Sequence, residues 1–323
     1  MDTSRAPSAP TRGRAFASTT RPRSARAPHS SSASAAVDYT THSAYSDPRS
    51  RAALLEALPV DAAALGAVSR NVIAHYRAHE AELPAETRSD IDLRWLDRIL
   101  DADQSRHPEP LAVERPLPNR VQGCCRDHTL FCVGALRQRG IPARSRVGFA
   151  TYFSPEWNHD HVVVEAHVGG RWVRFDPELS PGDKSFDALD MPVGPGSPFA
   201  TSAEVWRDHR AGRIDVETYG VDPDVPVRGE WFVGTYVVTE LAHRMKDELL
   251  LWDGWGVMGP DVAEHADLLD ELADVLVAAD AGDAGAEAEL ANRYRADDRL
   301  HPGDVVQSVS PLDGTFTQVP LAR

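Results

Sequence analysis

A cysteine near the expected start of a helix is the residue whose type and position most favour covalent chemistry. Cys125 follows Gly123-Cys124, and a helix-like run extends from Cys124 to Arg139, where Gly140-Ile141-Pro142 ends it. In the first turn of a helix, free N–H groups and the positive end of the dipole favour the thiolate, the nucleophilic form of cysteine. Cys125 is therefore the candidate nucleophile, and a buried structural thiol is the alternative for any isolated cysteine.

Two strand-like segments further along the chain predict a hairpin. Residues 161–168 and 171–175 are separated by Gly169-Gly170. A two-residue Gly-Gly loop accepts the positive φ angles of a type I′ turn, which joins antiparallel strands. This turn places Glu165 opposite Arg174, and an ion pair across the strands supports the register.

The same register places a histidine and a carboxylate on one face of the hairpin. His161 and Asp176 become diagonal neighbours, about 7–8 Å apart at the backbone and within reach of a hydrogen bond. A nucleophilic cysteine needs a base that exchanges its proton and a group that orients this base. We therefore predict catalytic roles for Cys125, His161 and Asp176. Because the opposite face, with Val162 and Val164, is more apolar, the His161 face should meet the cysteine helix through a polar cleft, with a separate core behind the sheet.

The histidines and cysteines around these positions lack the spacing of a metal site. His159 and His161 alternate on one strand, and Cys124, Cys125 and His128 lie near the expected helix start. Neither Cys-x-x-Cys nor a helical His-x-x-x-His occurs here, and those are spacings typical of zinc sites. We expect no metal and no cofactor.

An acyl-transfer site also needs N–H donors for the developing oxyanion. The backbone N–H of Cys125 is the natural first donor. Asn119 and Gln122 are candidates for the second donor, although amides in loops are more commonly only solvated.

Three further polar residues of the cysteine helix are interpreted as structural. Cys132 lies two turns beyond Cys125 on nearly the same helical face and is expected to be a buried thiol. His128 is expected to pack or to cap the helix. Asp127 is expected to bond nearby backbone or Arg144.

The order of the elements predicts an α+β fold. Helical periodicity extends from Ala63 to about His79, and Ser89-Asp90 would cap a second helix. The cysteine helix and strands 144–153, 161–168 and 171–175 follow, then an irregular Pro- and Gly-rich stretch, 180–200. Helices are expected at 231–252, 260–279 and 284–296. Helices at both ends with strands between them favour a mixed architecture.

Composition narrows the class of protein. The chain has 323 residues, 42% of them hydrophobic, and a formal net charge of −15. Such an acidic chain disfavours binding to nucleic acid or to an anionic membrane surface. No stretch of 18 apolar residues occurs, so no membrane span is expected. Three closely spaced cysteines exclude a disulfide framework, and a cytoplasmic location is the default prediction. The sequence does not set an oligomeric state.

Three regions are expected along the chain. Residues 1–46 form an Arg-, Ser- and Pro-rich leader, read as disordered, that resembles an organelle transit peptide or is a non-functional extension. Residues 47–300 form one domain, with its motifs at 120–180 and a C-terminal helical part at 230–300. Residues 301–323 form a tail or strand.

Four motifs together resemble a known family. They are Gly123-Cys124-Cys125-Arg126-Asp127-His128, the run RQRGIPAR from Arg137 to Arg144, the strand DHVVVE from Asp160 to Glu165, and WVRFDP from Trp172 to Pro177. Their order and spacing are similar to those of the transglutaminase-like core, a branch of the papain-like thiol enzymes. The resemblance covers about residues 120–180. Two positions depart from the family pattern: Val163, where Trp is frequent, and Glu178, where Thr or Ser is common.

The resemblance implies a papain-like core in which the cysteine helix packs on an antiparallel sheet, flanked by N- and C-terminal helices. It implies that Cys125 is the nucleophile, His161 the general base and acid, and Asp176 the orienting carboxylate. The expected function is cysteine-dependent acyl transfer or hydrolysis at an amide-type carbonyl, with a peptide or small-molecule amide or thioester as substrate. The alternatives are a catalytically inactive binding or scaffold module of the same fold and, less favoured, a cysteine–histidine metal protein.

Overall fold

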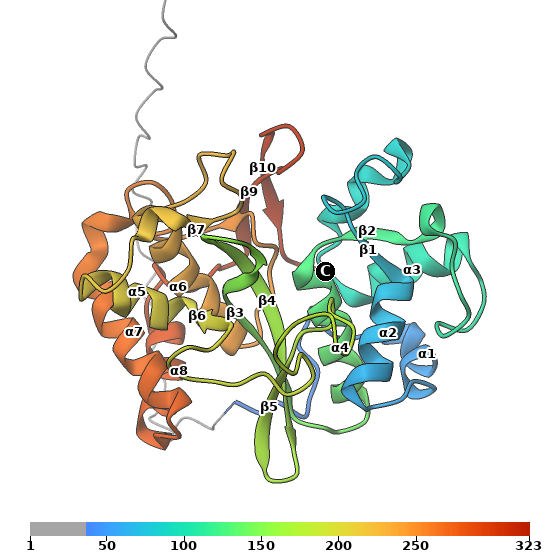
Figure 1. Ribbon diagram of the computed structural model, residues 1–323, viewed down its shortest axis with the longest axis horizontal. Coiled ribbons are helices and arrows are strands. Elements are labelled where there is room, and N and C mark those ends of the chain that lie inside the picture. Colours follow the sequence, from blue (N-terminus) through green and yellow to red (C-terminus); the bar gives the residue numbers. More distant parts are fainter. Residues whose placement is uncertain (1–36) are drawn as a thin grey trace, which may run out of the picture. The chain divides into compact units, whose positions relative to one another are not determined.

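A five-stranded sheet forms the centre of the fold, with helices on both sides (Figure 1). The computed structural model describes residues 37–323. Helices α5–α8 gather on one side of the sheet and α1–α4 on the other. The strand order is β5-β4-β3-β6, and β7 pairs in parallel with β4. This mixture of helices and a largely antiparallel sheet is the predicted α+β class.

The strands of the central sheet are β3 (Ala143–Ser154), β4 (Trp157–Val168), β5 (Arg171–Phe175), β6 (Phe199–Thr201) and β7 (Tyr219–Gly220). Outside it lie β1 (Ile73–His75), β2 (Val121–Gly123), β8 (Asp253–Gly254), β9 (Val305–Val309) and β10 (Phe316–Pro320). The α-helices are α1 (Ala52–Glu56), α2 (Ala62–Val72), α3 (Leu96–Arg106), α4 (Cys125–Gln138), α5 (Ser202–Arg210), α6 (Glu230–Arg244), α7 (Ala266–Asp280) and α8 (Ala284–Ala296). Short 3-10 helices occupy Arg49–Arg51, Ala85–Asp92, Leu117–Asn119, Val216–Thr218 and Val262–His265.

The β4–β5 hairpin has the register that the Gly-Gly turn predicts. Val168 pairs with Arg171, and Glu165 pairs with Arg174. The glycines of the turn have φ values of +60° and +81°, so both adopt the left-handed backbone that a type I′ turn requires. The turn therefore fixes which side chains share a face of the sheet.

Helix α4 begins and ends as its sequence predicts. Gly140 has a φ of +68°, and the N–H of Ile141 bonds the carbonyl of Leu136 at 3.0 Å, which closes the helix with a left-handed cap. The helix packs against β3 and β4, and the Thr129 hydroxyl donates to the carbonyl of Val162 at 2.9 Å. Its side chains are buried from Cys125 to Arg137.

Two N-terminal helices differ from their predicted bounds. Helix α2 ends at Val72 rather than near His79, because the next residues extend as β1 and pair in parallel with β2. Residues 85–92 form a 3-10 helix, and α3 begins only at Leu96. Asp90 caps no α-helix: its carboxylate pairs with Arg106 and accepts the backbone N–H of Gln122.

The C-terminal helices also differ at their ends. Helix α6 ends at Arg244 rather than near residue 252, and Lys246 follows with a φ of +72°, which no α-helix can continue through. Helix α7 begins at Ala266, after the 3-10 turn Val262–His265, rather than at residue 260. Helix α8 matches its predicted range of 284–296.

The core divides unequally around the sheet. The main cluster includes Val162 and Val164 together with side chains of α4 and α6. A small second cluster of Val163, Met191 and Phe199 lies apart from it. Val163 shares the strand face of His161, so this face is covered partly by apolar side chains of the 180–200 segment and not by a polar cleft alone.

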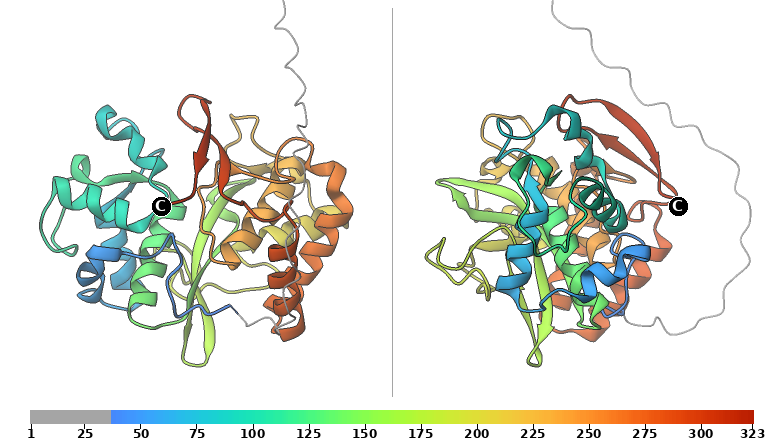
Figure 2. Two further views of the ribbon diagram at one scale, coloured as in Figure 1. Left: turned by 180° about the vertical axis from the view of Figure 1, so that it is seen from behind. Right: turned by 90° about the vertical axis from the view of Figure 1, so that its right-hand side faces the viewer.

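Packing begins before residue 47, the expected boundary of the domain. Tyr39 is buried and donates to the carbonyl of Arg244 at 3.0 Å, and Tyr45 lies in the main core. At the other end of the chain, β9 and β10 form an antiparallel hairpin, shown in red in Figure 2. Strand β9 of this hairpin also pairs with β8. Residues 1–36 of the predicted leader, 1–46, lie outside the described residues.

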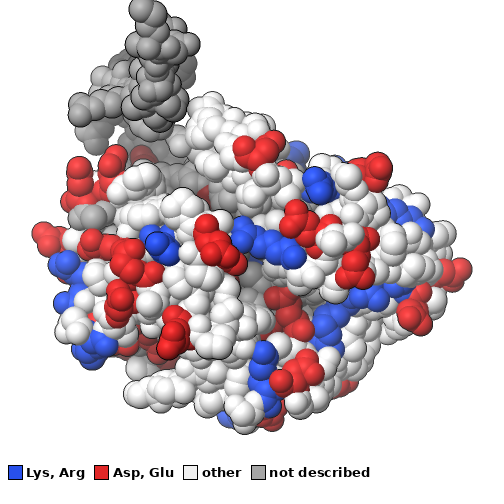
Figure 3. Space-filling view, turned by 45° about the horizontal axis from the view of Figure 1, so that its top comes forward, with Lys and Arg blue, Asp and Glu red and all other residues white. Residues whose placement is uncertain are grey.

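Acidic and basic side chains are interspersed on the face that Figure 3 shows. Among the described residues, no helix has both the length and the apolar character needed to cross a membrane.

Candidate active site

The start of α4 holds Cys125 through a network of short backbone contacts. Cys124 is the N-cap residue, and its N–H donates to the Asp127 carboxylate at 2.8 Å. A Cβ atom at Gly123 would lie 2.8 Å from the same carboxylate oxygen, so glycine allows this close approach. Asp127 also pairs with Arg126 at 2.8 Å, whereas Arg144 pairs with Glu165. Asp127 therefore has the structural role that the sequence predicts, without the contact to Arg144.

The thiol of Cys125 does not show the lowered pKa that its position at a helix start predicts. Its pKa is raised well above the usual value by a hydrogen bond with Cys124, by burial, and by the nearby charges of Cys124, Glu178 and Asp160. Cys125 is 4% exposed. Burial and neighbouring carboxylates disfavour the thiolate more than the helix start favours it, so the resting thiol is neutral.

His161 and Asp176 form a buried hydrogen-bonded pair. Nε2 of His161 lies 2.9 Å from Oδ2 of Asp176. Burial acts against the charged imidazole, but the charge and hydrogen bond of Asp176 outweigh it and raise the pKa of His161. The pKa of Asp176 is lowered, since the charge and hydrogen bond of His161 outweigh its burial. This arrangement leaves Nδ1 of His161 for proton exchange.

The three predicted catalytic residues come to one region, but they do not all touch. Among the described residues, no hydrogen bond joins the Cys125 thiol to His161, whose Nε2 bonds Asp176 instead. Both side chains lie near Glu178, whose charge acts on the pKa values of Cys125 and His161. Cys125 and His161 therefore feel a common carboxylate, with no hydrogen bond between the thiol and the imidazole.

Glu178 is part of this site, and the sequence marked it only as a departure from the family pattern. Its Oε2 lies 3.8 Å from Nδ1 of His161, and its Oε1 lies 3.4 Å from Nε2 of His128. Burial raises the pKa of Glu178 to about 8. His128 in turn bonds Ser69 through Nδ1 at 3.0 Å. His128 is thus buried beside the site and does more than pack or cap the helix.

Two tyrosines also reach the site, and no local sequence pattern indicated either. The hydroxyl of Tyr152 donates to Oδ2 of Asp176 at 2.6 Å. Tyr236 on α6 donates to Asp160, the residue before His161. The ring of Phe153 packs edge-on to the His161 ring, with centroids 5.0 Å apart. The end of β3 thereby packs against the histidine, and α6 holds the residue before it.

The second oxyanion donor is not supplied by the side chain of Gln122. Its amide donates to the carbonyl of Pro84 at 2.7 Å and to the Thr87 hydroxyl at 2.8 Å. Asn119 lies in a 3-10 turn before β2. Cys132 is fully buried, and burial raises the pKa of its thiol, as expected of a structural cysteine.

A metal ion could be held by three side chains of this site, those of His161, Asp176 and Glu178. One donor atom from each lies within 4.8 Å of the others. Nε2 of His161 is already hydrogen-bonded to Asp176, so the arrangement also suits an aspartate–histidine pair without a metal. The sequence spacing predicted no metal here.

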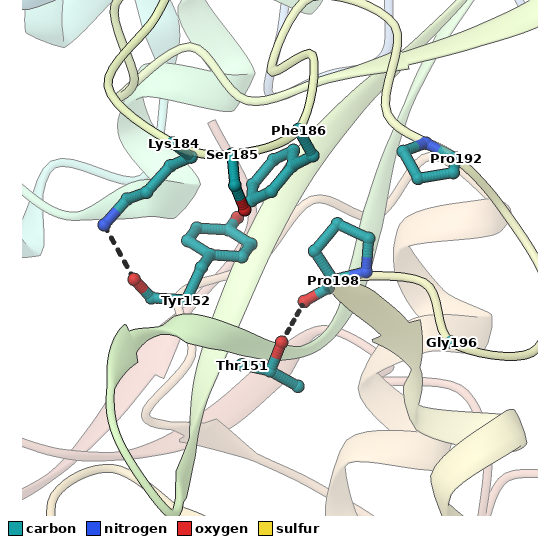
Figure 4. A pocket seen from close by; sticks show the side chains of 8 residues that line it. All are labelled: Thr151, Tyr152, Lys184, Ser185, Phe186, Pro192, Gly196 and Pro198. Atoms are coloured by element: carbon teal, nitrogen blue, oxygen red, sulfur yellow. Dashed lines mark hydrogen bonds between the residues drawn. The ribbon is translucent and has the colours of Figure 1, made fainter.

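A pocket of about 460 Å³ opens on the other side of Tyr152 (Figure 4). Most of its wall comes from the irregular 180–200 segment; its lining residues are Thr151, Tyr152, Lys184, Ser185, Phe186, Pro192, Gly196 and Pro198. The ammonium of Lys184 donates to the carbonyl of Tyr152 at 2.7 Å. Tyr152 both lines the pocket and bonds Asp176, so this one side chain contacts the pocket and the aspartate–histidine pair.

Part of this chain is similar to a known protein family. A family model described as the transglutaminase-like superfamily matches residues 84–177, a range that contains Cys125, His161 and Asp176. No curated protein matches. A solved structure of a proposed cysteine protease from Cytophaga hutchinsonii is similar over 44% of this chain and 42% of that chain, with 21% identity and a TM-score of 0.29. The chain thus spans less than half of that protein. The match to the transglutaminase-like superfamily thus covers the central part of this chain, residues 84–177, which includes α4 and the β3–β5 strands.

Proposed function

We propose that this protein is a cysteine-dependent acyltransferase or hydrolase that acts on an amide-type carbonyl. The observation that carries the proposal is the buried hydrogen bond between His161 and Asp176; Glu178 links this pair to His128 on the helix that bears Cys125. This combination supplies a nucleophile, a base and an orienting carboxylate. The family match supports a thiol-enzyme fold for the same residues.

The reaction proposed begins from a neutral thiol. As the sulfur of Cys125 attacks the carbonyl carbon, its proton passes to Nδ1 of His161, and a carbon–sulfur bond forms. The backbone N–H of Cys125 lies in the first turn of α4, where helical N–H groups lack helical acceptors and can bind the oxyanion. His161 then protonates the leaving amine as the carbon–nitrogen bond breaks.

The acyl-thioester is resolved in the second half of the reaction. Water or an amine attacks the carbonyl, gives a proton to His161, and releases the thiol, which takes the proton back. Asp176 holds the imidazole in the tautomer that presents Nδ1 to the sulfur. The contact between sulfur and imidazole must tighten when substrate binds, as catalytic hydrogen bonds commonly do between free and substrate-bound enzymes.

A catalytically inactive binding module is the second candidate function. The buried, neutral Cys125 favours it, because a thiol with a raised pKa reacts slowly with electrophiles. In that case the pocket beside Tyr152 would bind a ligand without turnover.

Trapping by intact mass distinguishes the two functions. The folded protein is incubated with a mixed library of amides and thioesters, and acyl adducts are measured for wild type, Cys125→Ala and Cys132→Ala. An enzyme forms an adduct in wild type and in Cys132→Ala but loses it in Cys125→Ala. An adduct that survives Cys125→Ala, or iodoacetamide that fails to modify Cys125 in the folded protein, would contradict the proposal.

A further inference from the structure

We infer that Glu178 is a positioning residue of this active site, which holds the His161 ring from the side opposite Asp176 and, when ionised, competes with the Cys125 sulfur for the charged imidazole. This inference rests on the proposed function. Its basis is geometric: the nitrogen of His161 that must exchange a proton with Cys125 has the Glu178 carboxylate 3.8 Å away.

The backbone around Glu178 is fixed on both sides. The N–H of Glu178 donates to Oδ1 of Asp176 at 2.9 Å. One guanidinium nitrogen of Arg70 bonds the carbonyls of Pro177 and Leu179, at 2.7 and 2.9 Å. With the residues before and after it tied to α2, Glu178 cannot move away without breaking these bonds.

The carboxylate also links the helix that carries the nucleophile to the strand that carries the base. Its second oxygen lies 3.4 Å from Nε2 of His128, which is one helical turn after Cys125 on α4. His128 is anchored by Ser69 of α2 at 3.0 Å. Glu178 is therefore placed to hold α4 and β4 at a set separation through two imidazoles, which a Thr or Ser side chain is too short to do.

Titratable groups from several elements face Glu178. His161 and Arg70 favour its charged form, whereas Asp176 and Asp127 oppose it. Tyr152 of β3 and Cys125 of α4 feel its charge in turn. Burial is the largest influence and, with the two aspartates, raises the pKa of Glu178 to about 8.

The sign of the effect on the thiol follows from these charges. At neutral pH the Glu178 carboxyl is largely protonated, and its negative charge develops as the pH rises through about 8. An anionic Glu178 disfavours the Cys125 thiolate and favours the protonated form of His161. Removal of this charge should therefore lower the pKa of both groups.

The test measures proton affinity and needs no substrate. The rate of iodoacetamide modification at Cys125 is followed by intact mass from pH 6 to 10 in wild type, Glu178→Gln, Glu178→Thr and the exposed control Glu80→Gln. For the two Glu178 variants we expect the rate at the alkaline end of this range, where Glu178 of wild type is ionised, to rise about tenfold, which corresponds to one pKa unit, the size typical of a nearby charge. The His161 ring titration, followed by NMR, should move to lower pH. Glu80→Gln should match wild type.

Separate outcomes decide the inference and the proposed function. Wild-type pH profiles in both Glu178 variants would overturn the inference, whatever acyl adducts form. Shifted profiles without any acyl adduct in wild type would support the role of Glu178 and contradict the proposed function. Modification of the buried Cys132 reports unfolding; if Glu178→Gln unfolds, Glu178→Thr decides, because it carries the residue common at this position in the family.

Discussion

The hydroxyl of Tyr152 and the imidazole of His161 bond the same oxygen of Asp176. The distances to this Oδ2 atom are 2.6 Å from the hydroxyl and 2.9 Å from Nε2. Both bonds help to lower the pKa of Asp176, with the larger effect from His161. Tyr152 also lines the adjacent pocket, so this side chain contacts both the pocket and the carboxylate that we propose orients His161.

The first prediction concerns this hydroxyl. Tyr152→Phe removes one donor to a charged acceptor, a loss of about 1.5 kcal/mol or roughly tenfold in the rate of acylation. The variant should fold, because the ring remains to pack against Phe186 at a centroid distance of 5.1 Å. Single-turnover acylation of Cys125 checks the effect, with Tyr219→Phe as a control in another strand. An unchanged acylation rate in Tyr152→Phe would show that the hydroxyl does not contribute to the reaction.

The second prediction concerns the orientation and charge of the base. Asp176→Asn should lower the acylation rate at least about 10²-fold, because the imidazole loses the carboxylate that fixes its tautomer. Since Asp176 raises the pKa of His161, its removal should move the acidic limb of the pH–rate profile to lower pH. A profile that keeps its acidic limb while only the amplitude falls would show that another group titrates there.

The third prediction concerns a cluster of buried charged side chains on β3, β4 and β5. Glu165 contacts Arg144, Arg146 and Arg174 at 2.8, 3.4 and 2.8 Å. Glu165→Gln leaves these buried cations with less opposite charge and should reduce the free energy of unfolding by about 3–5 kcal/mol. Urea unfolding at pH 7 measures the loss. Glu289, which forms an exposed ion pair with Arg293, provides the control. Glu289→Gln should reduce the free energy of unfolding by less than about 1 kcal/mol.

The same cluster predicts a pH dependence of stability. The three arginines outweigh burial and lower the pKa of Glu165. A lowered folded-state pKa stabilises the fold above the ordinary carboxyl value near about 4.3, and this stability is lost as the pH falls toward the folded pKa. Wild type should therefore lose stability between about pH 5 and 2 more steeply than Glu165→Gln. Parallel curves for the two proteins would contradict this assignment.

The fourth prediction concerns the strand beside His161. Gly148 pairs with His161 in the β3–β4 register, and a Cβ atom there would lie 2.1 Å from the backbone carbonyl oxygen of Ala200. Gly148→Ala must displace β6 and should destabilise the fold by at least about 1–3 kcal/mol. Gly254→Ala is the matched control, since its Cβ would meet its nearest neighbour only at 3.9 Å. Thermal unfolding compares the two, and equal melting temperatures would exclude the steric argument.

Local patterns predicted the elements that position the candidate site. The Gly169-Gly170 turn and two-residue alternation predicted the β4–β5 register, which the structure has. Turn geometry and side-chain alternation act over a few residues, so they can be read without knowledge of the fold. Gly140 predicted the end of α4 for the same reason.

Local patterns failed where distant segments compete. Helical periodicity in α2 continues past Val72, but pairing with β2, nearly fifty residues later, extends the chain there instead. Asp90 looked like a helix cap and is instead paired with Arg106. In both places a long-range contact outweighs the weaker local preference.

The sequence alone therefore determined the candidate cysteine, histidine and aspartate, the hairpin register and the α+β class. Tertiary structure decided the environment of these residues: the neutral Cys125, the Tyr152 bond to Asp176, and Glu178 between two histidines. The physical reason is that a pKa depends on burial and on charges brought together from α2, α4, β3 and β4. No spacing along the chain records how those four elements pack.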